Sequence, residues 1–107
     1  MEDIVLLEVR KTAPSTMEAF KFKFDAGGEF DMVIYDKASQ NCRIYEIKHS
    51  TEANEKQTLH LRDAEKCQIV EKRFGPISGK FVLYRGKDTF AEGVQYLNVE
   101  NYLCGLK

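Results

Sequence analysis

The sequence is poor in several residue types, and each shortage argues against a class of protein. It has no tryptophan, two histidines, and three cysteines, Cys42, Cys67 and Cys104, that form no Cys-x-x-Cys pair. This spacing argues against a disulfide scaffold or a paired-cysteine zinc site, so we expect buried thiols in a reduced, intracellular protein. No segment has the length and apolar character of a membrane span or a signal peptide, so we expect a cytoplasmic protein with no membrane partner.

An excess of charge of one sign is also lacking. Lys and Arg number 16, Asp and Glu number 17, and the formal net charge is −1. Such a balance gives no general attraction to nucleic acid, so binding of DNA or RNA requires a local patch or an attached domain. The sequence contains no glycine-rich phosphate loop, internal repeat or low-complexity tract.

The 107 residues are enough for one domain with a single modest core. The clearest strand signal is the alternation of Phe20, Phe22 and Phe24 with lysines. The full pattern predicts a helix over about 2–11, strands over 20–24, 30–35 and 42–48, a long helix over about 55–74, strands over 80–84 and 94–99, and a helix over 100–106. This order predicts an α/β domain with a central mixed sheet and helices packed on its faces.

The candidate site lies on the hairpin of residues 30–48. Glu46 and Lys48 are two residues apart on a strand, so their side chains share a face about 7 Å apart. If Tyr35 and Cys42 face each other across the loop, Asp31 lies opposite Glu46, with Cβ atoms about 5 Å apart. The three side chains then gather on one face of the sheet.

Two facing carboxylates in an apolar sheet repel each other and are partly desolvated, so a positive group is expected between them. Lys48 contributes, but a hard divalent cation such as Mg²⁺ or Mn²⁺ fits better, because it takes one or two carboxylates with water and substrate phosphate. Lys48 is then expected to orient or deprotonate a water, or to offset negative charge in a transition state. The alternative is that the site has no function. Asp31 is then an isolated aspartate whose carboxylate is hydrogen-bonded to the backbone or paired with a lysine. The Glu-x-Lys sequence is then a chance occurrence, which is common in a chain rich in both residues.

At these residues the chain resembles the PD-(D/E)XK superfamily, which includes restriction endonucleases, Holliday-junction resolvases and RecB-type nucleases. The segment Gly28-Glu-Phe-Asp31 stands where the superfamily has its first acidic motif, and Glu46-Ile-Lys48 stands where it has Glu-x-Lys. Phe30 replaces the usual proline. The resemblance implies an α/β/α sandwich with a central mixed sheet and a restriction-endonuclease-like core. It also implies metal binding by Asp31 and Glu46, with the Ile47 carbonyl as a further ligand.

The chain is most similar to the nuclease-like domain at the C-terminus of a family of prokaryotic AAA-type ATPases. That domain has a Glu-x-x-Val-x-x-Glu helix, matched by Glu2, Val5 and Glu8, and a Tyr-Glu-Ile-Lys-x-Ser strand, matched by residues 45–50. The resemblance implies that residues 1–107 are a C-terminal fragment and that the ATPase domain of the same parent chain is a partner.

Further site residues follow from the same resemblance. Glu2 corresponds to the acidic residue of the first helix that helps to bind the metal, with Glu8 as an alternative. Gln57 stands at the glutamine of a RecB-type Gln-x-x-x-Tyr motif, although Leu61 replaces the tyrosine. Lys56 and His60 lie on the inward stripe of the predicted helix 55–74, so they either face substrate phosphates or are solvated at a frayed helix end.

Two functions are open at this point. The first is a Mg²⁺- or Mn²⁺-dependent nuclease that cuts DNA or RNA, with DNA preferred, and in which Asp31, Glu46 and Lys48 are the catalytic residues. The second is an inactive module that docks onto or regulates the ATPase, or binds nucleic acid. The intact Asp…Glu-x-Lys set favours the first function, and the near-neutral charge favours the second.

Overall fold

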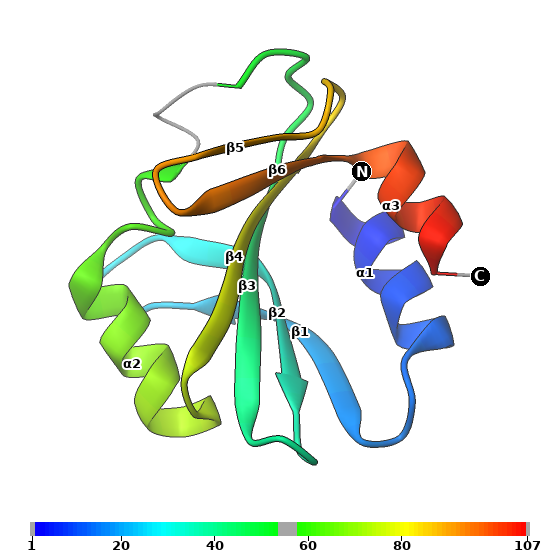
Figure 1. The fold of residues 1–107 in the computed structure, drawn as a ribbon. Helices are drawn as coiled ribbons and strands as arrows, with labels where there is room; N and C mark the ends of the chain where they lie inside the picture. Colours follow the sequence, from blue (N-terminus) through cyan, green and yellow to red (C-terminus); the bar gives the residue numbers. More distant parts are fainter. Residues whose placement is uncertain (1, 54–57, 107) are drawn as a thin grey trace.

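A six-stranded mixed sheet forms the centre of the molecule, with helices on both of its faces (Figure 1). The computed structural model describes residues 2–53 and 58–106, with the backbone alone at residue 2. In chain order the elements are α1 (Glu2–Thr12), β1 (Met17–Lys23), β2 (Glu29–Asp36), β3 (Asn41–Ile47), α2 (Ala64–Phe74), β4 (Ile77–Tyr84), β5 (Thr89–Ala91), β6 (Val94–Asn98) and α3 (Val99–Gly105). The predicted α/β domain with a mixed sheet is confirmed.

The strands lie in the order β1-β2-β3-β4-β6-β5. β1, β2 and β3 form an antiparallel meander, because short turns join them. β4 lies parallel to β3, and β6 lies parallel to β4. The parallel step from β3 to β4 requires a long crossover, which α2 supplies. The meander places β2 and β3, which carry the predicted site, in the interior of the sheet.

α2 covers one face of the sheet, and α1 and α3 cover the other (Figure 1). Each face has its own buried cluster, and the side chains of β3 are divided between them. Cys42 and Ile44 belong to the cluster beneath α2. Tyr45 and Ile47 belong to the cluster beneath α1 and α3. β3 is therefore covered on both faces, as its near-continuous apolar sequence predicts.

The long helix predicted over 55–74 is wrong over residues 58–63. α2 begins at Ala64, and residues 58–62 form turns, while residues 54–57 lie outside the described residues. The side chain of Asp63 accepts hydrogen bonds from the N–H groups of Glu65 and Lys66, so it caps the helix. A short acidic side chain favours this capping position over a helix interior, and it starts the helix later than the apolar spacing suggests.

The connection predicted over 85–93 contains the strand β5, which pairs with β6. All three residues of β5 are exposed, so they carry no apolar alternation that a sequence pattern detects. β4 also begins at Ile77 rather than residue 80, because parallel pairing with β3 extends into its polar start. These differences concern edges and ends of the sheet, where packing on a core does not constrain the sequence.

The prediction of buried thiols holds for two of the three cysteines. Cys42 and Cys67 are buried, but Cys104 is exposed because it lies on the outer side of the short helix α3. Among the helices that the structure describes, none has both the length and the apolar character that crossing a membrane requires.

The glycine that ends α2 provides a test of the fold. Gly75 has φ +87°, and a Cβ atom there would collide with the carbonyl oxygen of Gln40 in the β2–β3 loop. Gly93 has φ +76° but no atom within 4 Å of such a Cβ. We expect Gly75→Ala to lower the free energy of unfolding by about 3 kcal/mol, and Gly93→Ala by about 1 kcal/mol, because only the first adds a backbone clash to the strain of positive φ.

Urea denaturation followed by circular dichroism measures both changes. Equal losses of stability in the two variants would contradict the close approach of the α2 C-terminus to the β2–β3 loop.

Candidate functional site

Asp31 lies in a β-bulge of β2. In the pairing of β1 with β2, Phe20 faces Val33 and Phe22 faces Phe30, so β2 has one residue more than β1 between these two pairs. The extra residue places Phe30 and Val33 in the same buried cluster, although their odd spacing would put them on opposite faces of a regular strand. The bulge locally bends β2 where Asp31 leaves the regular ladder.

The register predicted for the β2–β3 hairpin is confirmed over its regular part. Tyr35 faces Cys42, and Met32 faces Tyr45. The ladder ends there, one step before Asp31 would pair with Glu46 through the backbone. The hairpin geometry therefore holds up to the edge of the site, and at the site the bulge replaces backbone pairing.

At this point a side chain, rather than the backbone, accepts the hydrogen bond that joins β2 to β3. The Oδ2 atom of Asp31 accepts a hydrogen bond of 2.8 Å from the N–H of Ile47. Asp31 is 6% exposed, so this bond forms in a largely desolvated environment. Its carboxylate thus ties the bulge of β2 to the end of β3.

Glu46 is buried beside Asp31. It is 2% exposed, and within the described part of the chain its Oε1 atom has no hydrogen-bond partner. Tyr45 and Ile47 face the α1 side, so strand alternation directs Glu46 toward the α2 side. A buried carboxylate oxygen without a partner costs free energy, which a proton or a bound cation would offset.

Lys48 follows the last residue of β3. Its backbone N–H donates to the carbonyl of Leu83 in β4, over 2.9 Å, which anchors the chain at this point. Its Nζ atom lies 3.7 Å from Oε2 of Glu46, and its side chain is 40% exposed. Lys48 therefore connects the buried carboxylate with solvent.

These neighbours shift the ionisation of Glu46 strongly. Burial, together with the hydrogen bond and the negative charge of Asp31, raises the pKa of Glu46 to about 9, while Lys48 opposes the shift. Without a cation, the site thus favours a protonated Glu46 at neutral pH.

The pair offers two hard oxygen ligands to a divalent cation. Among the described residues no group of three or more His, Cys, Asp and Glu side chains is placed to hold a metal ion. Mg²⁺ often binds through one or two carboxylates and completes its shell with water and phosphate oxygens, so Asp31 and Glu46 fit that ion. They fit Zn²⁺ poorly, because a structural zinc site takes four protein ligands, mostly Cys and His.

Of the two acidic residues predicted on α1, Glu8 makes no contact with this pair in the described structure. Glu2 is the first residue of α1, and its side chain lies outside what the structure describes. Glu8 lies more than one turn further along α1, with its carboxylate 3.7 Å from Nζ of Lys11. The role of Glu2 as a ligand stays a prediction.

The predicted substrate-binding residues divide into two groups. Lys56 and Gln57 lie outside the described residues. His60 lies in the turns before α2, with its Nδ1 atom 2.6 Å from Nζ of Lys66. Both side chains lie against Gly28, where a Cβ atom would be 2.7 Å from the Lys66 amine. His60 is thus close to Gly28, the residue that directly precedes β2. Gly28 lies three residues before Asp31 in the chain.

Lys66 has more specific surroundings than its charge pattern suggests. The mixture of acidic and basic residues around it in the sequence predicts an ordinary solvated surface. The structure instead pairs Lys66 with His60 and places its amine 5.6 Å from the ring centre of Phe24. Because Asp63 caps α2, Lys66 lies in the first turn of that helix. The capping residue Asp63 is therefore the sequence feature that could have indicated the position of Lys66.

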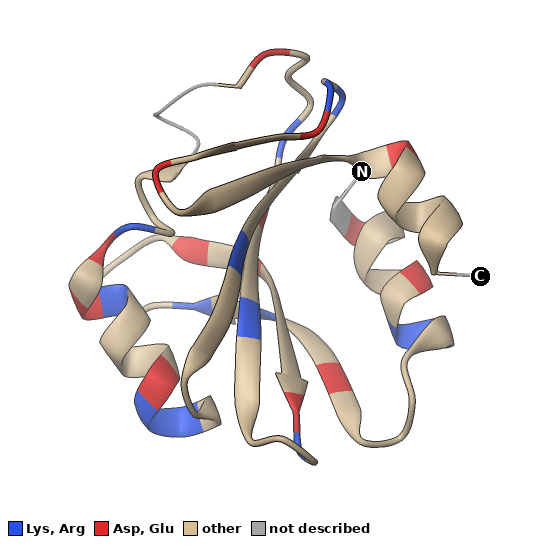
Figure 2. Cartoon of the chain, in the orientation of Figure 1, with Lys and Arg blue, Asp and Glu red and all other residues tan. Residues whose placement is uncertain are grey.

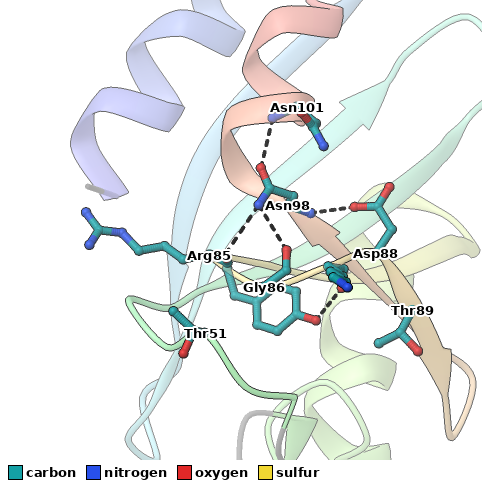
Figure 3. Close-up of a pocket in the computed structure, with 9 residues that line it drawn as sticks. Thr51, Arg85, Gly86, Asp88, Thr89, Asn98 and Asn101 are labelled. Carbon is teal, nitrogen blue, oxygen red and sulfur yellow. Dashed lines mark hydrogen bonds between the residues drawn. The ribbon is translucent and has the colours of Figure 1, made fainter.

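An open pocket lies at the carboxyl ends of β4 and β6 (Figure 3). Its volume is about 570 Å³. Its lining residues are Thr51, Tyr84, Arg85, Gly86, Lys87, Asp88, Thr89, Asn98 and Asn101. Figure 3 shows that many of its polar groups bond to one another rather than point into open space.

Asn98 is at the centre of these bonds. Its side chain donates to the carbonyl of Gly86 and accepts from the N–H of Asn101, and its own N–H donates to Asp88. The Tyr84 hydroxyl donates to the carbonyl of Lys87. This network closes the β4–β5 loop and begins α3, so it explains the polar residues of the pocket without a ligand. Asp31 and Glu46 do not line it.

Comparison with known proteins gives no relative from which a function can be transferred. No protein-family model, no curated protein and no solved structure matches the chain. The likeness to PD-(D/E)XK proteins stays a prediction from the sequence motifs, and the geometry of Asp31, Glu46 and Lys48 is the basis for assigning a function.

The raised pKa of Glu46 predicts how stability depends on pH. Its folded-state pKa of about 9 is above the ordinary value of 4.5, so the folded state binds more protons between these two values. The stabilisation is complete below pH 4.5 and is lost as the pH rises toward 9. We expect Glu46→Gln, which keeps an uncharged side chain, to be more stable than the native protein at about pH 8 by about 2–4 kcal/mol and to lose this advantage near about pH 5.

Urea denaturation at the two pH values, without divalent cations, measures the difference. Glu18→Gln is the matched control, because Glu18 is exposed on β1 and pairs only with Lys37 in the described structure. A Glu46→Gln advantage that is the same at both pH values would contradict a buried, protonated Glu46.

Proposed function

We propose that this domain is a divalent-metal-dependent nuclease that hydrolyses phosphodiester bonds of nucleic acid. Asp31 and Glu46 bind the metal, which is Mg²⁺ or Mn²⁺, and Lys48 serves the reaction at the solvent side of the pair. We also propose that the domain belongs to the PD-(D/E)XK superfamily, which its motifs resemble. Its fold would then be the restriction-endonuclease-like sandwich of helices around a mixed sheet.

The observation that carries the proposal is the buried oxygen of Glu46 that lacks a hydrogen-bond partner within the described residues. A glutamate retained only for packing would be expected to have both oxygens satisfied, since an unsatisfied buried polar atom costs about 1–3 kcal/mol. Here a second carboxylate lies beside it, which raises the cost further. A bound cation removes both penalties at once.

The roles of the side chains follow from their positions. Asp31 presents its second oxygen while Oδ2 remains bonded to the N–H of Ile47, so its orientation does not depend on the metal. Glu46 would release its proton to solvent in order to hold a cation. The Lys48 side chain, 3.7 Å from Glu46 and 40% exposed, would hold a substrate phosphate as an ammonium, or would take a proton from the attacking water in its deprotonated form. The metal supplies charge stabilisation at the phosphate.

The surroundings of the pair support a substrate with phosphate groups. His60 and Lys66 lie against Gly28, which is three residues before Asp31 in the chain, and the Lys66 amine provides positive charge there. We propose nucleic acid as the partner, with DNA preferred over RNA. We also propose that the domain is attached to an AAA-type ATPase domain of the same parent chain, because the sequence motifs of α1 and β3 resemble those of such C-terminal domains.

One observation favours a second function. Asp31 and Glu46 are only 6% and 2% exposed, and the open pocket at the carboxyl ends of β4 and β6 does not include them. Positive and negative side chains are also interspersed over the chain, for example along α2 (Figure 2). An inactive module that docks onto the ATPase, or regulates it, accounts for the closed site and for the interspersed charges.

Metal binding and substrate cleavage, measured together, separate the two functions. We expect calorimetric titration with Mg²⁺ or Mn²⁺ to show binding to the native protein and a loss of at least about tenfold in affinity in the Asp31→Asn, Glu46→Gln double variant, which removes both charged ligands. Cleavage of single- and double-stranded substrates is then measured for both proteins and for Lys48→Met. We expect Lys48→Met to bind metal but to cleave at least about a hundredfold more slowly.

The control is Asp36→Asn, Glu18→Gln, which removes the same number of carboxylates from the less buried ends of β2 and β1. Equal metal affinity of the native protein and the Asp31→Asn, Glu46→Gln variant would remove the metal site. Metal binding without cleavage of any substrate, even with the ATPase domain present, would favour the docking module.

A further inference from the structure

The outer side of α1 is apolar at its centre. Leu7 is 53% exposed and Ile4 is 60% exposed, and both lie one turn apart on a helix of 11 residues. The opposite side of the helix is buried through Val5 and Val9. The packing of α1 on the sheet thus accounts for one of its faces and leaves two large aliphatic side chains on the other.

Charged residues are arranged around Leu7 in a regular way. Asp3 precedes it by four residues and Lys11 follows it by four, so the three form one row along the exposed surface. Ile4 and Arg10 lie three residues before and after Leu7, and both are exposed. Figure 2 shows an acidic segment near the start of α1 and a basic segment near its end, with a further acidic segment just before the basic one. The exposed face is therefore acidic at one end, apolar in the middle and basic at the other end.

Such a face is complementary to itself in the antiparallel direction. A two-fold axis through Leu7 places Asp3 of one copy against Lys11 of the other, twice. It also places Ile4 against the aliphatic stem of Arg10, whose Nε atom donates to the carbonyl of Ala19 over 2.8 Å. The two Leu7 side chains meet at the axis. We propose that two copies of this chain associate through an antiparallel α1–α1 contact.

The antiparallel direction has one further physical advantage. It places the positive N-terminal end of each helix dipole beside the negative C-terminal end of the other. The contact of Lys11 with Glu8 in its own helix, at 3.7 Å between partly exposed groups, is weak enough to yield to a second partner. The face is thus complementary in apolar pattern, charge and dipole to one specific occupant.

The size of the contact sets the strength of association. A helix of 11 residues is about 16 Å long, so two such helices bury less than the ~1,000 Å² expected of a stable specific complex. The dimer is therefore weak and reversible, and it forms in concentrated solution. The proposal is independent of the nuclease function, because it rests on α1 and not on Asp31 or Glu46.

Charge reversal tests the pairing directly by sedimentation equilibrium. Asp3→Lys alone brings two lysines together at each end of the contact, and Lys11→Asp alone brings two aspartates together there. We therefore expect each variant to self-associate at least about tenfold more weakly than the native chain. A mixture of the two variants restores opposite charges at both ends of the contact. We expect the mixture to form a heterodimer at least as tight as the native dimer.

Two controls accompany this experiment. Lys72→Asp reverses a charge in the last turn of α2, and Ile69→Ala shortens an exposed aliphatic residue of α2, so both are matched to changes in α1. Both controls are expected to self-associate like the native chain, whereas Leu7→Ala is expected to abolish association. Circular dichroism verifies that each variant is folded.

Three results would overturn the proposal. The first is a native chain that remains monomeric up to millimolar concentration, which would leave the α1 face to a different partner. The second is self-association that Leu7→Ala leaves intact. The third is a mixture of the two charge variants that associates no better than either variant alone.

Discussion

Two carboxylates share a desolvated space at the point where β2 and β3 separate, and the candidate site depends on how they are kept there. Asp31 is held because its carboxylate replaces a backbone acceptor for the N–H of Ile47. Glu46 is held because its backbone pairs with Val82 of β4 and because β3 is covered on both faces, so its side chain is almost fully buried. The sheet thus confines a charge that water would otherwise stabilise, and a proton or a cation must compensate it.

The rest of the fold supplies the rigidity that this confinement requires. A parallel strand on one side of β3 and an antiparallel strand on the other fix its backbone over most of its length. The two buried clusters, one beneath α2 and one beneath α1 and α3, hold the neighbours of Glu46 in place on either face. Lys48 lies outside this packing because it follows the end of β3. Of Asp31, Glu46 and Lys48, it is the residue whose side chain reaches solvent. A buried acid pair beside an exposed amine is an arrangement suited to chemistry at the surface of a rigid sheet.

Sequence patterns predicted the helices and strands that pack on the core. Three features follow from which side chains must be buried, and the structure has them as expected. They are the alternation of Phe20 and Phe22, the apolar run of β2, and the hairpin register at Tyr35 and Cys42. The patterns failed where no core contact constrains the residues. The exposed strand β5 and the turns before Ala64 are examples, since their conformation comes from pairing with β6 and from the capping of α2 by Asp63.

The sequence by itself determined that Asp31, Glu46 and Lys48 come together, because strand periodicity and a short hairpin leave few alternatives. It also determined the ends of α1 as acidic and basic, from which the self-complementary face arises. Only the tertiary structure decided that Asp31 lies in a bulge and bonds to Ile47, that Glu46 is left with an oxygen lacking a partner within the described residues, and that Leu7 is exposed. The physical reason is that burial and the loss of backbone pairing depend on neighbours that are distant in the chain, and no local pattern contains them.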